Sequence, residues 1–197
     1  MIRHVYALVI PLILLSGCSE VPGDAAYRSG HKDIAAKYYE DQFNLGSVKA
    51  GDRLAQMYSR GDGVPQDYAK AFLIYSELAA RGEPLAFHNL GVCYQNGLGT
   101  KKDLLKAEQS YRKAADSGVL WAIFNLGTMY SDHLTQKDDD IEGLTLLLRA
   151  QRLAKGDSGA EVGIREDRFG TNGGHVAKMR KRMTPQQIAL AEEAAKR

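Results

Sequence analysis

Residues 90–118 read LGVCYQNGLGTKKDLLKAEQSYRKAADSG, and this stretch decides the fold. Its first part, up to Asn96, and its second part, from Leu104, both place small and apolar residues at the spacing of one helix face. Gly97 and Gly99 lie between the two parts, and glycine adopts turn conformations that other residues avoid. The stretch therefore predicts two helices joined by a loop.

The same pattern recurs along the chain with a period of 36 residues. The first helix repeats an alanine, a leucine and a tyrosine at Ala50, Ala86, Ala122; Leu54, Leu90, Leu126; and Tyr58, Tyr94, Tyr130. The second helix repeats its flanking and apolar positions at Asp67, Asp103, Asp139; Tyr75, Tyr111; Ala79, Ala115; and Gly82, Gly118. A period of this length is the signature of a repeat architecture.

Each unit is predicted to be a pair of helices, A and B. Ala50, Leu54 and Tyr58 are four residues apart, so they share one face of helix A. Gly61 suits the left-handed position that commonly ends a helix. Asp67 stands where its carboxylate can accept the free backbone N–H groups at the start of helix B.

The repeat resembles the Sel-one-like repeat, a relative of the tetratricopeptide repeat with a longer loop between helices A and B. The resemblance covers residues 30–155 and is most specific over 49–84 and 85–120. It implies an all-α fold, a right-handed α-solenoid of helix-pair repeats with a 36-residue period. The first unit is represented by its helix B, and the third departs from the pattern, with His133 and Thr135 in place of the loop glycines.

Residues 156–197 are expected to form a glycine-rich loop and C-terminal capping helices. Six of the chain's 20 glycines lie between positions 156 and 174, which favours a loop. A helix is expected over Val176–Arg182, and Thr184-Pro185-Gln186-Gln187 favours the start of another. The basic run of the first helix is expected to be a solvated face, with contact to anionic lipid headgroups as the alternative: Lys178, Arg180, Lys181 and Arg182.

Residues 1–17 have the pattern of a signal peptide. Arg3 precedes the uncharged run VYALVIPLILL, which is too short to span a bilayer. The sequence Leu15-Ser16-Gly17-Cys18 then resembles a bacterial lipoprotein signal, which implies cleavage before Cys18 and acylation of that cysteine, with palmitate as a typical chain. Ordinary secretion with a chance cysteine is the alternative.

The same resemblance implies a cellular address. Ser19 rather than aspartate follows the cysteine, which in the lipoprotein sorting rule implies an outer membrane lipoprotein facing the periplasm. Residues 18–29 are expected to be the lipidated cysteine and a tether, followed by the solenoid over 30–155.

Neither composition nor motifs predict catalysis. The formal net charge of +2 gives no case for nucleic acid, which requires a clear basic excess. The histidines have no zinc-binding spacing, and the chain has neither a nucleophile elbow nor a phosphate loop. Cys93 aligns with Met57 and Met129, which predicts a core residue. No catalytic residue, metal or cofactor is therefore expected, and the chain is predicted not to be an enzyme.

Partner binding is expected at the helix A positions that the repeat does not use for packing. By analogy with tetratricopeptide geometry, these positions face a groove. The predicted partner-binding residues are Arg60, Leu85, His88, Val92, Gln95, Asn96, Trp121, Phe124, Thr128 and Asp132, with Lys49, Asp52, Gln56, Ser59 and Ser131 at equivalent positions. Trp121 and Phe124 have an alternative role, packing beneath the C-terminal segment as a cap.

The family resemblance implies a protein-binding module. Some small lipoproteins with such repeats are immunity proteins that neutralise secreted antibacterial effectors, including lipases delivered by type VI secretion. The preferred hypothesis is therefore an immunity protein that occludes a secreted toxin sterically, attached to the membrane by its N-terminal lipid anchor. The alternative is an envelope assembly scaffold or host-interaction factor that uses the same solenoid groove.

Overall fold

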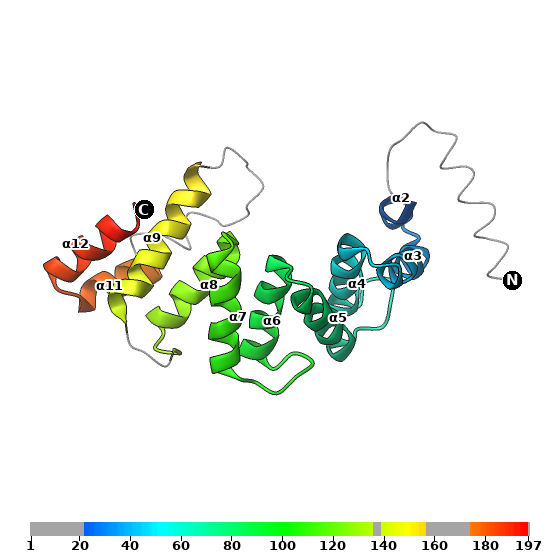
Figure 1. Ribbon diagram of the computed structural model, residues 1–197, viewed down its shortest axis with the longest axis horizontal. Helices are drawn as coiled ribbons and strands as arrows, with labels where there is room; N and C mark the ends of the chain where they lie inside the picture. The colour runs from blue at the N-terminus through cyan, green and yellow to red at the C-terminus, as the bar shows by residue number, and fades with distance from the viewer. Residues whose placement is uncertain (1–21, 136–138, 157–173, 197) are drawn as a thin grey trace, which may run out of the picture. The chain divides into compact units, whose positions relative to one another are not determined.

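The computed structural model describes residues 22–135, 139–156 and 174–196 (Figure 1). All regular secondary structure within these ranges is α-helical. The chain divides into two compact units between Arg81 and Gly82, and each unit is described by itself. The predicted signal peptide, Cys18 and residues 157–173 of the glycine-rich loop lie outside the described residues.

The first unit consists of helices that each pack against the next in sequence: α2 (Pro22–Arg28), α3 (Lys32–Asn44), α4 (Val48–Arg60) and α5 (Tyr68–Ala80). The faces that the repeat predicts to be apolar form its core. Leu54 of α4 is 3% exposed and Tyr75 of α5 is 6% exposed, with Ala35 and Tyr39 of α3 also buried. Helices α4 and α5 are therefore the A and B helices of the first complete repeat.

The helix ends form at the repeated glycine and aspartate positions. Gly61 and Gly97 have φ angles of 68° and 72°, the left-handed conformation expected at the end of helix A. Asp67 accepts a hydrogen bond from the Lys70 backbone N–H at 2.9 Å, and Asp103 accepts the equivalent bond from Lys106 at 3.0 Å. Because the same signals recur, α4, α5 and α6 (Pro84–Asn96) are all 13 residues long.

The segment expected to be a tether is helical from Pro22 onward. Gly23 and Ala26 of α2 are buried against α3. A Cβ on Gly23 would lie 2.6 Å from the ring of Tyr38, so only glycine allows this close approach of α2 to α3. The structure thus differs from the tether prediction over Pro22–Arg28. A proline and an acidic residue in the first turn, Pro22 and Asp24, are the helix-start signals there.

The second unit contains α6, α7 (Leu104–Asp116), α8 (Leu120–Ser131), α9 (Asp140–Gly156), α11 (His175–Arg182) and α12 (Pro185–Ala194) among its described residues. Helices α6 to α9 pack in sequence order, and α11 and α12 lie alongside α9 (Figure 1). Their shared core is apolar and includes Tyr111, Ile123, Leu126, Met129, Leu144, Leu147 and Met179.

The third repeat keeps the turn without its glycine. His133 occupies the position of Gly61 and Gly97 and has a φ of 55°, in the left-handed region. The following backbone N–H, that of Leu134, donates to the Met129 carbonyl at 2.9 Å, as Leu98 donates to Cys93 in the previous repeat. Asp139 then accepts from the backbone N–H of Glu142 at 2.9 Å and caps α9. Asp139 therefore caps its helix in the same way as Asp67 and Asp103 cap theirs.

The other departures of this repeat make room for the C-terminal helices. A Cβ on Gly143 would lie 2.5 Å from Tyr130 and 2.6 Å from the Met179 methyl of α11, so the alanine of the other repeats would not fit. Helix α9 has 17 residues rather than 13 and packs against both α11 and α12. The third helix B thus supports the cap predicted for residues 176–197.

The last helix begins as its sequence predicts. The Thr184 hydroxyl accepts from the Gln187 backbone N–H at 3.3 Å, and the Gln187 side chain accepts from the Thr184 backbone N–H at 2.8 Å. This reciprocal pair is a capping box. Ala191 is fully buried against α9, so α12 closes the apolar end of the second unit.

Candidate partner-binding surface

On α4, predicted side chains border a pocket of about 580 Å³. Lys49, Gln56 and Arg60 line it, together with Arg53 of the same helix. Helices α2 and α3 and the loop after α4 complete its walls with Asp24, Tyr27, Arg28, Tyr39 and Asp62. Ligand pockets fall in the range of roughly 300–1,000 Å³, so this one is large enough to accept part of a partner molecule.

Asp24 organises one side of the pocket. Its carboxylate accepts a hydrogen bond from the Tyr39 hydroxyl at 2.5 Å and from Lys49 Nζ at 3.1 Å, and Arg53 Nε lies 4.0 Å away. The Tyr39 hydrogen bond, followed by the one from Lys49, lowers the pKa of Asp24 below its usual value. Asp24 is therefore ionised at neutral pH and holds two cations of α4 at the pocket wall.

Asp62 organises the opposite side. Its carboxylate accepts hydrogen bonds from the Tyr27 hydroxyl and from Lys32 Nζ, the latter at 2.6 Å. These donors, Lys32 first, lower the pKa of Asp62. Asp62 thus connects the loop after α4 to α2 through Tyr27 and to α3 through Lys32. The remaining predicted positions of α4, Asp52 and Ser59, bond within the helix to Gln56, whose side-chain amide donates to Asp52 at 2.7 Å.

The predicted positions of α6 mostly have partners inside their own unit. Gln95 accepts the Tyr111 hydroxyl at 2.7 Å, Asn96 donates to the Val92 carbonyl at 2.9 Å, and Val92 packs against the core. His88 lies beside the Tyr111 ring, with 5.8 Å between ring centroids, and burial lowers its pKa to about 4. Leu85 is 55% exposed and is the open apolar residue of this set.

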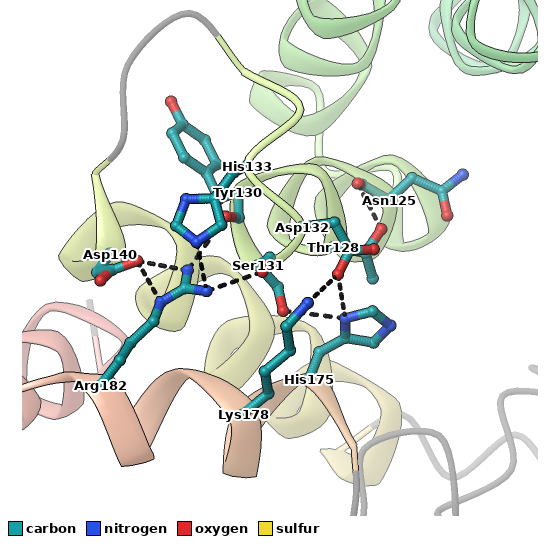
Figure 2. Close-up of polar contacts among 10 residues, drawn as sticks. All are labelled: Asn125, Thr128, Tyr130, Ser131, Asp132, His133, Asp140, His175, Lys178 and Arg182. Atoms are coloured by element: carbon teal, nitrogen blue, oxygen red, sulfur yellow. Dashed lines mark hydrogen bonds and ion pairs between the residues drawn. The ribbon is translucent and has the colours of Figure 1, made fainter.

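Three of the predicted positions at α8, Phe124, Ser131 and Asp132, contact the C-terminal helix α11, and Figure 2 shows the contacts of the last two. Phe124 is 6% exposed and meets the His175 ring edge-on, the arrangement of its capping alternative. Asp132 accepts from Lys178 Nζ at 2.6 Å, and buried Ser131 lies 3.0 Å from His175 Nδ1. Thr128 donates to the Asn125 carbonyl, and Trp121 packs, partly buried, on the core. This helix presents little unbonded surface.

The basic run of α11 is mostly exposed, but several of its side chains form ion pairs. Arg182 donates to Asp140 at 2.5 and 2.8 Å and to the Ser131 carbonyl at 2.9 Å, as Figure 2 shows. Lys178 pairs with Asp132, and Arg180 pairs with Glu192 of α12 at 2.6 Å. Lys178 and Arg180 remain exposed, as a solvated face predicts, whereas the Arg182 side chain is only 23% exposed, so the prediction is wrong for Arg182. Acidic partners from other helices bind all three side chains, and no local sequence pattern reveals such partners.

Metal binding and thiol reactivity are two of the chemical properties about which the sequence makes predictions. No cluster of three histidine, cysteine, aspartate or glutamate residues suited to a metal occurs among them. Cys93 is buried, and burial raises the pKa of its thiol to about 11, which disfavours the reactive thiolate. None of the helices in the described ranges is long and apolar enough to cross a membrane.

The sequence-based prediction found one wall of the pocket and missed the others. Lys49, Gln56 and Arg60 follow from the repeat pattern of α4. Asp24 and Tyr27 lie on α2, which has no counterpart at the repeat period, so only the helix-start signal at Pro22 could have placed them.

Comparison with known families matches the repeated region. The family model of the Sel1 repeat matches residues 42–83 and 84–119, which contain α4 to α7. The structure is also similar to the Sel1 repeat protein from Oxalobacter formigenes, with a TM-score of 0.57 and 25% identity over 68% of this chain and 59% of that one.

A second solved structure matches over a greater share of this chain. It is a protective antigen present in uropathogenic Escherichia coli strains that displays an SLR fold, with a TM-score of 0.68 and 25% identity. The match covers 88% of this chain and 37% of that chain.

Two curated relatives share a shorter segment. Both are exopolysaccharide production negative regulators, from Rhizobium meliloti strain 1021 and Rhizobium leguminosarum bv. viciae. Each is 43% identical over 60 residues, which is 30% of this chain and 22% of the relative. The match thus spans about a fifth of the length of these relatives.

These findings confirm the predicted all-α fold of helix-pair solenoid repeats and the family resemblance. Folds of this type typically serve as scaffolds for binding other proteins. Residues 42–83 and 84–119 of the chain are Sel1 repeats.

Proposed function

We propose that this protein is a periplasm-facing outer membrane lipoprotein that acts as an immunity protein. In this role it binds a secreted antibacterial effector, such as a lipase delivered by type VI secretion, and blocks it sterically. The proposal combines the protein-binding repeat fold with the lipoprotein-like sequence ending at Cys18.

The observation that supports it best is the contrast among the predicted binding positions. Those of α8 are bonded to α11, bonded within α8 or packed on the core. Lys49, Gln56 and Arg60 of α4 instead border an open pocket. A protein that inhibits by occlusion needs an accessible, shaped surface and no catalytic group of its own. The pocket provides such a surface on the first unit.

Rescue from toxicity tests the proposal. The chain with its own signal sequence would first be used as bait for affinity capture of effectors from the source bacterium. Each captured effector would then be expressed in the periplasm of a susceptible strain. Restored growth on co-expression of the chain is the expected result. A catalytically inactive effector controls for expression load. An effector that binds the chain but kills equally in its presence would contradict the immunity role.

A second candidate function has its own support. The similarity to a protective antigen of uropathogenic Escherichia coli covers 88% of this chain, which favours a host-interaction or envelope scaffold role. Capture of envelope or host proteins together with a failed rescue is the outcome expected for this candidate.

A further inference from the structure

We propose that the pocket formed by α2, α3 and α4 binds an acidic segment of the partner protein, one that places carboxylates beside an apolar side chain. This inference rests on the proposed protein-binding function and specifies the chemistry of the partner at one site.

The charge of the pocket is the first argument. Four basic side chains line it, against the two carboxylates Asp24 and Asp62: Arg28, Lys49, Arg53 and Arg60. The whole chain has a formal net charge of only +2, so an excess of this size in one pocket is a local concentration of positive charge. Such a concave positive site attracts anionic groups and raises their local concentration.

The cations on α4 are held in place yet keep donors for a ligand. Asp24 fixes Lys49 Nζ at 3.1 Å and Arg53 Nε at 4.0 Å, while the two side chains remain 63% and 51% exposed. An ammonium has three donors and a guanidinium five, so one contact to Asp24 leaves several unused. A carboxylate accepts two parallel hydrogen bonds from a guanidinium fork. Arg53 is therefore oriented to receive one.

The remaining walls suit a peptide rather than an isolated ion. Tyr27 and Tyr39 use their hydroxyls on Asp62 and Asp24, so their rings and Met57 form the apolar part of the wall. Tyr39 and Met57 are each 3% exposed, and Lys32 Nζ lies 5.1 Å from the centre of the Tyr27 ring, so this apolar part is small. Arg60 is exposed on the same wall, one turn beyond Gln56. An acidic side chain next to an aliphatic or aromatic one would therefore satisfy both kinds of surface.

The pocket's own carboxylates argue against a polyanion. Asp24 and Asp62 keep their charge, because hydrogen bonds from Tyr39 and Lys32 stabilise the ionised form. They would repel a phosphate dianion or a nucleic acid strand more strongly than single carboxylates. A flat membrane of anionic lipids would also engage only the rim of a concave site. A protein segment with dispersed carboxylates fits the observations best.

The test uses the full chain and a short fluorescent peptide that alternates glutamate with leucine or phenylalanine. Its counterpart replaces each glutamate by glutamine. Fluorescence anisotropy measures the affinity of both for the unaltered chain and for Arg53→Glu and Arg60→Glu. Arg149→Glu, which makes the same charge change at an exposed position of α9, is the matched control. Vesicles containing anionic lipid provide a separate probe.

We expect the unaltered chain to bind the glutamate peptide. Either pocket variant should weaken this affinity about tenfold or more, as for loss of a charge pair at an interface. Arg149→Glu should leave the affinity unchanged. Equal affinity for the glutamine peptide, or equal weakening by Arg149→Glu, would overturn the proposal. Vesicle binding that needs Arg53 and Arg60, without peptide binding, would overturn it in favour of a lipid ligand. Capture of an effector unaffected by the pocket variants would remove this site but leave the proposed function intact.

Discussion

His88 has an imidazole whose Nδ1 is buried without a hydrogen-bond partner in the described structure. An unpaired buried polar atom costs free energy, and protonation of the ring would add the cost of burying a charge. Burial accordingly lowers the pKa of His88 from the usual 6.5 to about 4. The residue thus couples the stability of the second unit to pH.

We expect His88→Phe to reduce the acid sensitivity of folding. Between pH 6.5 and about 4, the unfolded chain binds a proton at His88 that the folded chain does not, so stability falls as pH falls through this window. At about pH 5 the loss amounts to about 2 kcal/mol relative to neutral pH. Urea unfolding at both pH values, followed by Trp121 fluorescence, measures it.

The control for this effect is His31→Phe, at an exposed histidine outside the second unit. It should lose as much stability on acidification as the unaltered chain. If His88→Phe shows that same loss, the imidazole is not the source of the pH dependence.

At the scale of elements, the spacing of α6 and α7 depends on Gly91. A Cβ at this position would lie 2.5 Å from two ring carbons of Tyr111, and that ring is fully buried and cannot move aside. We expect Gly91→Ala to cost about 1–3 kcal/mol, as for overpacking of a core. The double variant Gly91→Ala/Tyr111→Leu should cost less than the sum of its single changes, because the smaller side chain relieves the clash.

Urea unfolding of the four proteins in this cycle gives the coupling energy. Strict additivity of the two single changes would show that the glycine does not set the distance between the helices. Ala55 occupies the equivalent position in the first complete repeat and is fully buried, so that repeat has room for a Cβ. In the third repeat a Cβ on Gly127 would lie 2.9 Å from Leu147, so the requirement depends on the residue that faces the position.

The attachment of α11 depends on Arg182. Its guanidinium donates to Asp140 and to the carbonyls of Ser131 and Tyr130, and its side chain is only 23% exposed. We expect Arg182→Ala to weaken the C-terminal cap by about 1–3 kcal/mol, because buried acceptors lose their donor. Hydrogen exchange should accelerate over residues 175–196 and remain unchanged in α4 and α5.

Lys181→Ala is the matched control, since the neighbouring Lys181 is exposed. Equal exchange rates in the two variants would contradict a structural role for the Arg182 contacts.

Whether an element could be predicted from the sequence depends on how far apart in the chain its stabilising contacts lie. The glycine and aspartate at each helix end act locally and recur, so the bounds of α4 to α7 follow from the sequence. In the third repeat His133 replaces the glycine but adopts the same left-handed turn, so the sequence has no glycine there to mark the end of the helix. The contact of Arg182 with Asp140 joins positions 42 residues apart, and the pocket wall from α2 depends on packing against α3. Neither has a periodic signature, so both had to come from the structure.

For the whole molecule, the proposed lipid anchor at Cys18 would lie close to the pocket in sequence. Pro22, the first residue of α2, lies four residues after Cys18. Since an extended chain spans at most about 3.6 Å per residue, acylation of Cys18 would hold the start of α2 within about 15 Å of the bilayer surface. Asp24, Tyr27 and Arg28 of this helix line the pocket. A lipidated chain would thus present its pocket where an effector that attacks membrane lipids must act.

We expect Cys18→Ala to separate anchoring from binding. Acyl chains hold a protein at the membrane through about 0.8 kcal/mol per buried methylene, so the variant should lose incorporation of a palmitate analogue and leave the membrane fraction. The pocket is lined by residues from Asp24 onward, so we expect the purified variant to bind its partner with unchanged affinity but to protect cells less. Cys93→Ala changes the chain's other cysteine, which is buried, and should retain the label. Acylation at Cys18 would be contradicted if the label persists in Cys18→Ala or disappears equally in Cys93→Ala. Full protection of cells by the unanchored variant would contradict the need for membrane proximity.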